Sequence, residues 1–197
     1  LTGGIGAGKS TVGRLLAEHG AVVVSSDDLA PEVVAPVTPG LAAVVARFGP
    51  EILLPDGSLD RAALARRVFA DASERADLEA ITHPLIRSLT EQHRRAAQAE
   101  GVQVWVQEIP LLVEAARHDA YDVVVVVEAS EAVRLARLIA RGLTEADARM
   151  RMAQQASDEQ RRAIADVVID NSGDEAALRP QVEHLWADLT RRASERG

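Results

Sequence analysis

The sequence of 197 residues contains no cysteine, a single lysine and only 3% aromatic residues. Without cysteine there is no disulfide framework, no thiolate metal ligand and no cysteine nucleophile. No run of about eighteen apolar residues occurs, and the chain does not open with a basic segment followed by an apolar one. Neither a transmembrane helix nor a signal peptide is therefore expected, and the cytoplasm is the expected location.

The charge balance is acidic, with 22 Lys+Arg against 30 Asp+Glu and a formal net charge of −8. A negative surface disfavours non-specific binding to nucleic acids or anionic membranes. The hydrophobic fraction of 47% is that of an ordinary globular protein and excludes a disordered chain. All but one of the basic residues are arginines. Because guanidinium and ammonium groups are not interchangeable, the retention of Lys9 indicates a site that needs an ammonium.

Short valine-rich runs alternate with segments that carry apolar residues at three- and four-residue spacing. Such runs are typical of strands buried on both faces, as in a parallel sheet covered by helices. Strands are predicted over residues 21–24, 102–106, 123–127 and 167–169. Helices are predicted over residues 10–19, 60–70, 74–99, 130–141, 144–165 and 174–193. The alternation predicts an α/β fold with a doubly wound parallel sheet.

The spacing of these elements divides the chain into three parts. The first two strands are much farther apart than one crossover helix requires, so residues 28–98 are expected to form a helical insertion. Residues 134–162 are rich in arginine within an acidic chain, and we expect them to form a helical lid. The remaining core is expected to comprise residues 1–27, 99–133 and 163–197.

Residues 3–10 read Gly-Gly-Ile-Gly-Ala-Gly-Lys-Ser and fit the phosphate-binding pattern G-x-x-x-x-G-K-[ST] at every fixed position. Glycines let backbone N–H groups converge on phosphate oxygens, and the N-terminus of the following helix favours an anion. Lys9 is expected to reach the β- and γ-phosphates of ATP, and the Ser10 hydroxyl to bind Mg²⁺. The predicted nucleotide contacts of this loop are Gly4, Ile5, Gly6, Ala7, Gly8, Lys9, Ser10 and Thr11. Only Leu1 and Thr2 precede the loop, so the strand leading into it is expected to begin before Leu1.

Other features of the chain favour a kinase that acts on a small molecule. A guanine-nucleotide switch needs an Asn-Lys-x-Asp motif, which is impossible where Lys9 is the only lysine. A small-molecule kinase instead needs a carboxylate near its acceptor, an insertion that holds the acceptor and an arginine-rich lid. Asp27 and Asp28 follow the first valine-rich run, ahead of the expected insertion and lid. Asp27 is predicted to accept or orient the proton of the acceptor hydroxyl, and Asp28 to cap the helix that begins there.

The sequence resembles the dephospho-CoA kinases over almost its whole length. The motifs Pro-Leu-Leu-x-Glu and Ala-Asp-x-x-Ile-x-Asn-x-Gly make the resemblance specific, since the phosphate-binding loop alone is generic. The segments that carry it are Leu1–Thr11, Asp27, Glu32–Val34, His83–Ile86, Ile109–Glu114 and Ala165–Gly173. The chain departs from the family at Ser25, where the family has Asp, and at Pro31, where the family tends to have Arg.

The resemblance implies transfer of the ATP γ-phosphoryl group to the ribose 3′-hydroxyl of dephospho-CoA, the last step of coenzyme A biosynthesis. It also implies a core, a lid and a helical CoA-binding subdomain. ATP and dephospho-CoA are then the small-molecule partners, with Mg²⁺ as the metal.

The remaining candidate residues are assigned by their position in these segments. Arg137 and Arg141 are spaced by four residues, so we expect them on one helix face, closing over the transferring phosphates. Asn171 follows the last strand, where a contact with adenine is expected. Glu108 follows the strand predicted at 102–106 and is a weaker candidate than Ser10 for Mg²⁺. On the acceptor side, the expected contacts are Asp27, His83, Arg87, Glu108 and Leu111.

Two other functions stay open at this point. The first is a kinase of another small acceptor, such as a nucleoside monophosphate or a shikimate-like alcohol. The second is a nucleotide-binding protein without catalytic activity, which the departures from the family at Ser25 and Pro31 support.

Overall fold

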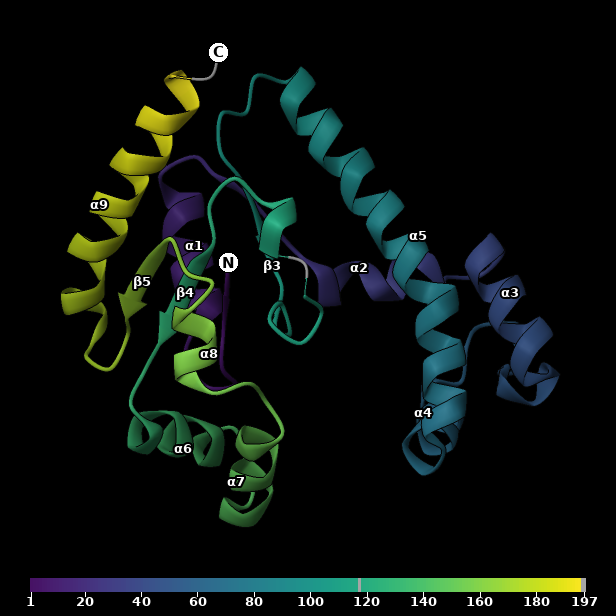
Figure 1. Ribbon diagram of the computed structural model, residues 1–197. Coiled ribbons are helices and arrows are strands. Elements are labelled where there is room, and N and C mark those ends of the chain that lie inside the picture. The colour runs from purple at the N-terminus through teal and green to yellow at the C-terminus, as the bar shows by residue number, and fades with distance from the viewer. Residues whose placement is uncertain (117, 196–197) are drawn as a thin grey trace. The chain divides into compact units, whose positions relative to one another are not determined.

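The computed structural model describes residues 1–116 and 118–195 (Figure 1). These residues form two compact units, one made of Leu1–Val24 with the chain from Gly101 onward and the other of Ser25–Glu100. The strands are β1 (Thr2–Gly3), β2 (Val22–Ser25), β3 (Trp105–Glu108), β4 (Val125–Glu128) and β5 (Val167–Asp170). The helices are α1 (Lys9–Glu18), α2 (Ser26–Val33), α3 (Pro39–Phe48), α4 (Arg61–Ala70), α5 (Ala72–Ala99), α6 (Glu131–Ala140), α7 (Glu145–Ala153), α8 (Asp158–Arg162) and α9 (Glu175–Ser194). Short 3₁₀ turns occupy Pro50–Ile52 and His118–Ala120.

The sheet of the first unit places β1 in its centre. β1 pairs with β4 and β4 with β5, both in parallel, while β2 pairs with β3. The Leu1 nitrogen donates to the Gln107 carbonyl at 2.8 Å, and the Ile109 N–H donates to the Leu1 carbonyl at 2.9 Å. These two bonds have the pattern of a parallel pair and join β3 to the residue before β1. The strands therefore follow the order β2-β3-β1-β4-β5, which confirms the α/β class with a parallel sheet.

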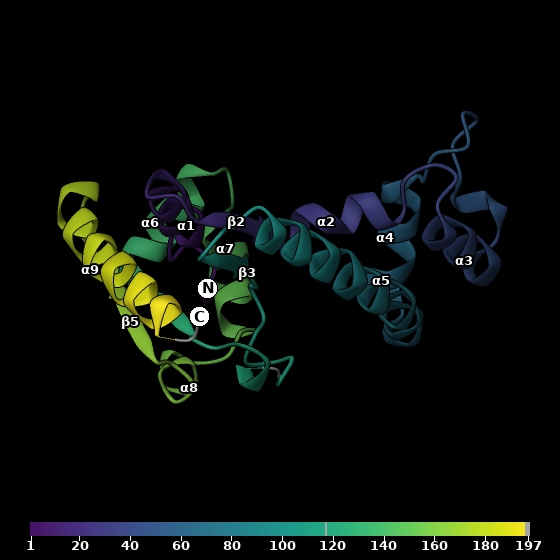
Figure 2. The ribbon, with the colours of Figure 1, turned by 90° about the horizontal axis from the view of Figure 1, so that it is seen from above.

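The consecutive valines at 124–127, which run into β4, are buried on both faces of the sheet. Val125 and Val127 belong to the core formed with α1 and α9, whereas Val124 and Val126 belong to a second core on the opposite face. Figure 2 shows α1 and α9 on one side of the sheet and α8 on the other. Because successive side chains of a strand point in opposite directions, only an uninterrupted apolar run satisfies both cores. This is why the run at 123–127 does not alternate with polar residues.

Strand β5 lies at the edge of the sheet, beside α9 (Figure 1). Its pairing with β4 uses the N–H groups of Val167 and Asn171, so the backbone groups of Asp170 face away from β4. The side-chain amide of Gln181, on α9, bonds to both of them. Asp170 N–H donates to Gln181 Oε1 at 3.1 Å, and Gln181 Nε2 donates to the Asp170 carbonyl at 2.8 Å. One glutamine thus fixes the end of β5 next to Asn171.

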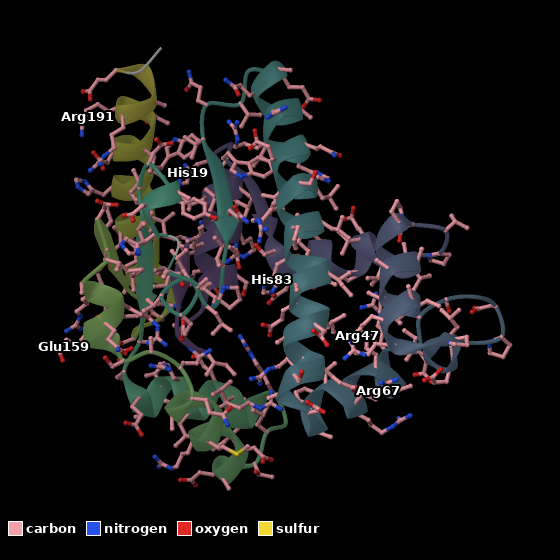
Figure 3. All side chains as sticks on the ribbon, turned by 45° about the vertical axis from the view of Figure 1, so that its right-hand side comes forward. His19, Arg47, Arg67, His83, Glu159 and Arg191 are labelled. Carbon is pink, nitrogen blue, oxygen red and sulfur yellow. The ribbon has the colours of Figure 1, made fainter. Side chains whose placement is uncertain are left out.

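The second unit consists of helices packed around α5, which contacts α2, α3 and α4. Phe48, at the end of α3, is 2% exposed and lies in the core of this unit. The guanidinium carbons of Arg47 and Arg67 lie 5.1 and 5.3 Å from the centre of its ring (Figure 3). Arg67 also donates to the Phe48 carbonyl at 2.6 Å and forms an ion pair with Glu74. These contacts join α3, α4 and α5, since each helix contributes one of the partners.

The first helix of the second unit is capped differently from the sequence prediction. Ser25, not Asp28, is the N-cap of α2, and its Oγ accepts from the Asp27 N–H at 3.2 Å. Serine and aspartate are both favoured at an N-cap, so the sequence did not decide between them. Asp27 and Asp28 instead occupy the first turn of α2, where negative charge interacts favourably with the helix dipole.

Two further boundaries predicted from the sequence were wrong. The strand predicted at 102–106 is β3, which ends at Glu108, so Glu108 is the last residue of the strand and does not follow it. The helix predicted at 144–165 is two helices, because α7 ends at Ala153 and a capping box formed by Ser157 and Gln160 starts α8.

Arg141 is also outside the helix in which it was predicted. Helix α6 ends at Ala140, and Gly142 follows Arg141 with a φ of 92°. The Gly142 N–H donates to the Ile139 carbonyl at 2.9 Å, and the Leu143 N–H donates to the Leu138 carbonyl at 3.2 Å. This is the glycine-terminated Schellman arrangement that ends many helices. Arg141 is therefore the C-cap of α6, and its N–H still donates to the Arg137 carbonyl one turn earlier, at 3.2 Å.

Candidate functional site: the phosphate-binding loop

The loop between β1 and α1 has the backbone geometry that its glycines predict. Gly6 and Gly8 have φ values of 80° and 93°, which glycine adopts without a steric penalty. The Ala7 N–H donates to the Gly4 carbonyl at 3.1 Å and closes a turn. Gly8 is the N-cap of α1, so the first turn of that helix begins directly at Lys9. The loop therefore ends at a helix N-terminus, where backbone N–H groups and the helix dipole favour a bound phosphate.

Lys9 and Ser10 both lie in the first turn of α1. Lys9 Nζ donates to the Gly3 carbonyl at 2.9 Å, so its side chain folds back along the loop. The Ser10 side chain is exposed. The first turn of α1 thus carries an ammonium and a hydroxyl, the two groups that the loop pattern predicts for a nucleotide phosphate and its metal ion.

Two glycines of the loop leave room for polar side chains from other elements. A Cβ on Gly4 would lie 2.5 Å from an Nη atom of Arg134, and a Cβ on Gly8 would lie 2.1 Å from Asn171 Nδ2. Asn171 is 4% exposed, and its Nδ2 donates to the Ala7 carbonyl at 2.7 Å. The predicted adenine contact of Asn171 stays a prediction; in the structure, its amide nitrogen supports the loop.

Asn171 offers a test of this support. In the variant Asn171→Asp, burial and the neighbouring Ala7 carbonyl should raise the pKa of the introduced carboxyl in the folded protein, against the opposite effect of the Arg137 guanidinium, which donates to the same carbonyl at 3.3 Å. At pH 7 we expect a loss of about 2 kcal/mol in the free energy of unfolding, because the ionised group faces an acceptor and cannot donate. Below its unfolded pKa of about 4 the carboxyl is protonated in both states and donates again, so the loss should shrink as the pH falls.

The measurement is urea unfolding of the variant and the parent protein at pH 7 and at about pH 4.5, just above the ordinary aspartate pKa. Asn171→Leu is the matched control, since it lacks the donor at both pH values and should lose the same amount at each. A loss for Asn171→Asp that does not change with pH would contradict this account.

Arg137 contacts the loop, whereas Arg141 lies beyond the end of α6. Arg137 donates to the carbonyls of Gly6 and Ala7 at 3.4 and 3.3 Å. The Arg141 side chain is exposed, and its backbone N–H donates to the last turn of α6. Of the two predicted lid arginines, the structure brings Arg137 to the phosphate-binding loop.

Arg134 and Gln155 contact the loop, although neither was predicted from the sequence as a site residue. Arg134 is 6% exposed, and its Nε donates to the Ile5 carbonyl at 3.0 Å. The Gln155 side-chain oxygen accepts from the Ile5 N–H at 2.7 Å. The sequence shows Arg134 only as one of several arginines in the segment 134–162, and it carries no signal for Gln155. Only the fold brings both to the loop.

Asp158 holds two buried arginines beside the loop. Its Oδ1 accepts from Arg134 at 3.2 Å and from Arg161, which is 2% exposed, at 2.9 Å. Burial lowers the pKa of the Arg134 guanidinium, while the charge of Asp158 opposes that shift. The cluster has two positive charges and one negative, and Glu131 and Glu128 are further negative charges that act on Arg134.

The acidic candidate Glu108 lies against the helix that starts at the loop. A Cβ on Gly13 would lie 2.2 Å from Glu108 Oε1, so this carboxylate occupies the space left by the glycine. The described residues contain no group of three or more His, Cys, Asp or Glu side chains arranged to hold a metal ion. Leu111, three residues after β3, is 49% exposed.

The remaining candidates lie in the second unit. Asp27 is exposed in the first turn of α2. His83 lies near the middle of α5 (Figure 3), and Arg87 is one turn further along the same helix. His83 and Arg87 are therefore neighbours on one face of α5.

Comparison with known proteins identifies the family of this chain. Residues 1–177 match the family model for dephospho-CoA kinase, which includes the whole phosphate-binding loop and Asn171. The chain belongs to the dephospho-CoA kinase family. A dephospho-CoA kinase of Streptomyces avermitilis is 53% identical over 100% of this chain and 96% of its own length.

Two solved structures are similar to this chain over almost its whole length. The crystal structure of TT1252 from Thermus thermophilus has a TM-score of 0.81 at 34% identity, covering 96% of this chain and 95% of that one. Dephospho-CoA kinase from Campylobacter jejuni has a TM-score of 0.72 at 25% identity, with the same coverage of both chains. Within the described part of the chain, no helix is long and apolar enough to cross a membrane.

Proposed function

We propose that the protein transfers the γ-phosphoryl group of ATP to the ribose 3′-hydroxyl of dephospho-CoA, giving CoA and ADP. This reaction is the last step of coenzyme A biosynthesis, and we place it in the cytoplasm, where ATP is available. The observation that carries the proposal is the match of residues 1–177 to the dephospho-CoA kinase family, together with a complete phosphate-binding loop at Gly3–Ser10.

In this proposal the loop binds the phosphates of ATP through its backbone N–H groups. Lys9 places its ammonium on the β- and γ-phosphates, where it offsets the charge that develops during transfer. The loop fits Mg²⁺ through the hydroxyl of Ser10, with Glu108 as a weaker candidate, and Mg²⁺ characteristically combines few protein ligands with phosphate oxygens and water. When bound, Mg²⁺ would neutralise charge on those oxygens.

On the acceptor side, Asp27 accepts or orients the proton of the ribose 3′-hydroxyl. A loose phosphoryl-transfer transition state depends more on positioning than on a strong base, so an ordinary carboxylate is suited to this role. The other proposed acceptor contacts are His83, Arg87, Glu108 and Leu111. Arg87 provides a cation for a phosphate of the acceptor, and Arg137 and Arg141 provide cations for the phosphates during transfer.

The test is a product assay with purified protein, ATP and Mg²⁺, with and without dephospho-CoA. We expect ADP release that depends on both substrates and a product with the mass of CoA. AMP and shikimate serve as alternative acceptors, and phosphorylation of either in place of dephospho-CoA would contradict the proposed substrate. Binding of ATP without any phosphorylated product would favour the non-catalytic alternative.

The variant Ser25→Asp tests whether an inactive parent protein lacks only the carboxylate at position 25 or lacks the proposed activity altogether. Aspartate is as good an N-cap as serine, so this variant should keep α2 intact while restoring the carboxylate that the family has there. If the parent protein makes no CoA and Ser25→Asp does, Ser25 limits the activity. If both are inactive, the proposed function is wrong.

The role of Asp27 predicts a difference between two neighbouring residues. Asp27→Asn should lower kcat by about 10²-fold, the lower end of the range for loss of a general base. Asp28→Asn changes the same functional group in the same helix turn and should lower kcat by less than about threefold, an effect on the order of a surface substitution. Equal effects of the two substitutions would show that α2 needs negative charge in its first turn and that Asp27 has no special role.

A further inference from the structure

Glu114 is the last residue of the Pro-Leu-Leu-x-Glu motif and has no part in the proposed reaction. It lies in a turn after β3, in which the Ala115 N–H donates to the Leu111 carbonyl at 3.0 Å. Leu112, in the same turn, is 2% exposed and belongs to the core on the α8 face of the sheet. The buried leucine thus fixes to the sheet the turn that carries the exposed Glu114.

The Glu114 carboxylate reaches a second turn, which lies between α7 and α8. Its Oε1 accepts from the Ala156 N–H at 2.8 Å, across 42 residues of sequence. The N–H groups on either side, those of Gln155 and Ser157, are bonded to residues close to them in the sequence. Glu114 therefore links this turn to the turn after β3, and a carboxylate that accepts from a backbone N–H forms a charge-assisted hydrogen bond.

The residue before Ala156 is Gln155, whose side chain contacts the phosphate-binding loop. Its Oε1 accepts from the Ile5 N–H at 2.7 Å, and the Ile5 carbonyl accepts from Arg134 Nε at 3.0 Å. Both backbone polar groups of Ile5 are thus bonded to side chains of the protein. Ile5 is held in one orientation directly before the part of the loop that curves, Gly6–Gly8.

The loop benefits from such support because it is rich in glycine. Four of the six residues at 3–8 are glycines, and glycine loses more conformational freedom on ordering than any other residue. A loop that is already ordered loses less entropy when it binds ATP, and its groups are in position before binding. Contacts that fix Ile5 therefore contribute to ATP affinity, while the Ile5 N–H stays bonded to Gln155 when ATP binds.

We propose that Glu114 is a positioning residue of the nucleotide site, which acts through Gln155 on Ile5. The carboxylate fixes the turn at Ala156, and the turn presents the amide oxygen of Gln155 to the Ile5 N–H. Held in this way, Ile5 keeps the loop in the conformation that binds ATP. The inference rests on the proposed binding of ATP by this loop and adds to the site a residue from the turn after β3.

Removing either link is expected to weaken ATP binding. Gln155→Ala removes the acceptor of the Ile5 N–H, and Glu114→Ala removes the anchor of the turn. Each should raise the Kd for ATP by about three- to tenfold, the range that one hydrogen bond gives. Glu114→Gln loses the charge but keeps an acceptor of nearly the same shape, so its Kd should stay within about twofold of the parent value.

The double variant Glu114→Ala/Gln155→Ala tests whether Glu114 acts through Gln155. Once the Gln155 side chain is absent, the anchored turn has no amide oxygen to present to Ile5. The double variant should therefore bind ATP as Gln155→Ala does, whereas independent effects would multiply the two increases in Kd. The measurement is calorimetric titration of the parent and variant proteins with ATP and Mg²⁺, after urea unfolding has shown that each is folded.

Glu159→Ala is the matched control for the loss of charge. Glu159 is an exposed glutamate in the first turn of α8 (Figure 3), three residues after Ala156. The substitution removes the same negative charge as Glu114→Ala and leaves both links in place. It should change the Kd for ATP by less than about twofold.

Three results would overturn the proposal. They are multiplied effects in the double variant, an increase in Kd for Glu114→Gln as large as that for Glu114→Ala, and an equal effect of Glu159→Ala. CoA formation by the parent protein is measured separately. If the parent makes no CoA but the ATP affinities follow the expected pattern, the proposed reaction is wrong and the role of Glu114 stands; if the parent does not bind ATP, both are wrong.

Discussion

Lys9→Ala is expected to lower kcat/KM for ATP by about 10³-fold or more while the protein remains folded. Removing a single preorganised charge from a phosphoryl-transfer site has effects of this size, because the lost interaction is strongest in the transition state. Within the fold, the substitution removes the hydrogen bond from Lys9 Nζ to the Gly3 carbonyl. Loss of that bond should cost no more than about 1.5 kcal/mol of stability.

Lys9→Arg is the informative companion, because every other basic residue of this chain is already arginine. A guanidinium is larger and planar, and its donors form a rigid fork in place of the compact ammonium. We expect Lys9→Arg to recover less than about a tenth of the parent activity. The measurements are steady-state CoA formation and thermal unfolding. Normal turnover in Lys9→Ala would contradict the assignment of the loop, and full activity in Lys9→Arg would show that any cation suffices.

Gly3→Ala is expected to cost about 3–5 kcal/mol of folding free energy, a loss large enough to prevent folding in a protein of ordinary stability. Gly3 has a φ of 151°, and an added Cβ would lie 2.2 Å from the carbonyl oxygen of Val127. That oxygen belongs to the backbone of β4, opposite Gly3 in the parallel pair, so it cannot move aside without breaking the sheet. The strain therefore cannot be relieved by a side-chain rotation.

Gly101→Ala is the matched control for this prediction. Gly101 also has a positive φ, of 80°, but apart from Gly101 and its two chain neighbours no described residue has an atom within 4 Å of the position that an added Cβ would take. Only the backbone penalty of about 1–2 kcal/mol then applies. Urea unfolding of the two variants separates the collision with β4 from the cost of the backbone conformation. Equal losses in both would show that the contact with Val127 contributes nothing.

The parts of the fold that the sequence predicted are those that depend on local patterns. The valine runs located β2, β4 and β5 within one or two residues, because strands buried on both faces leave a continuous apolar signal. The strand β3 was misplaced toward its N-terminus. It continues into Gln107 and Glu108, and polar side chains at the end of a strand are invisible to a search for apolar runs.

In the candidate site, too, the sequence predicted the features that depend on consecutive residues and missed those that depend on packing. The loop from Gly3 to Ser10 was predicted in full, since its chemistry lies in consecutive residues. Its contacts with Arg134 and Gln155 were not, because they depend on how α6 and the turn before α8 pack on the loop. Arg137 contacts the loop in the structure, while the predicted role of Arg137 and Arg141 in closing over the phosphates stays a prediction.

The contact of Gln181 with Asp170 has a consequence for the behaviour of the protein at high concentration. An edge strand with unpaired backbone groups is a template to which a strand of another molecule can add. At the end of β5, however, the Gln181 amide already offers one donor and one acceptor to Asp170, as a neighbouring peptide group would. Val168, which lies in β5 two residues before Asp170, has a side chain that is 42% exposed. The glutamine that supports β5 beside Asn171 thus also protects the open edge of the sheet against intermolecular strand addition.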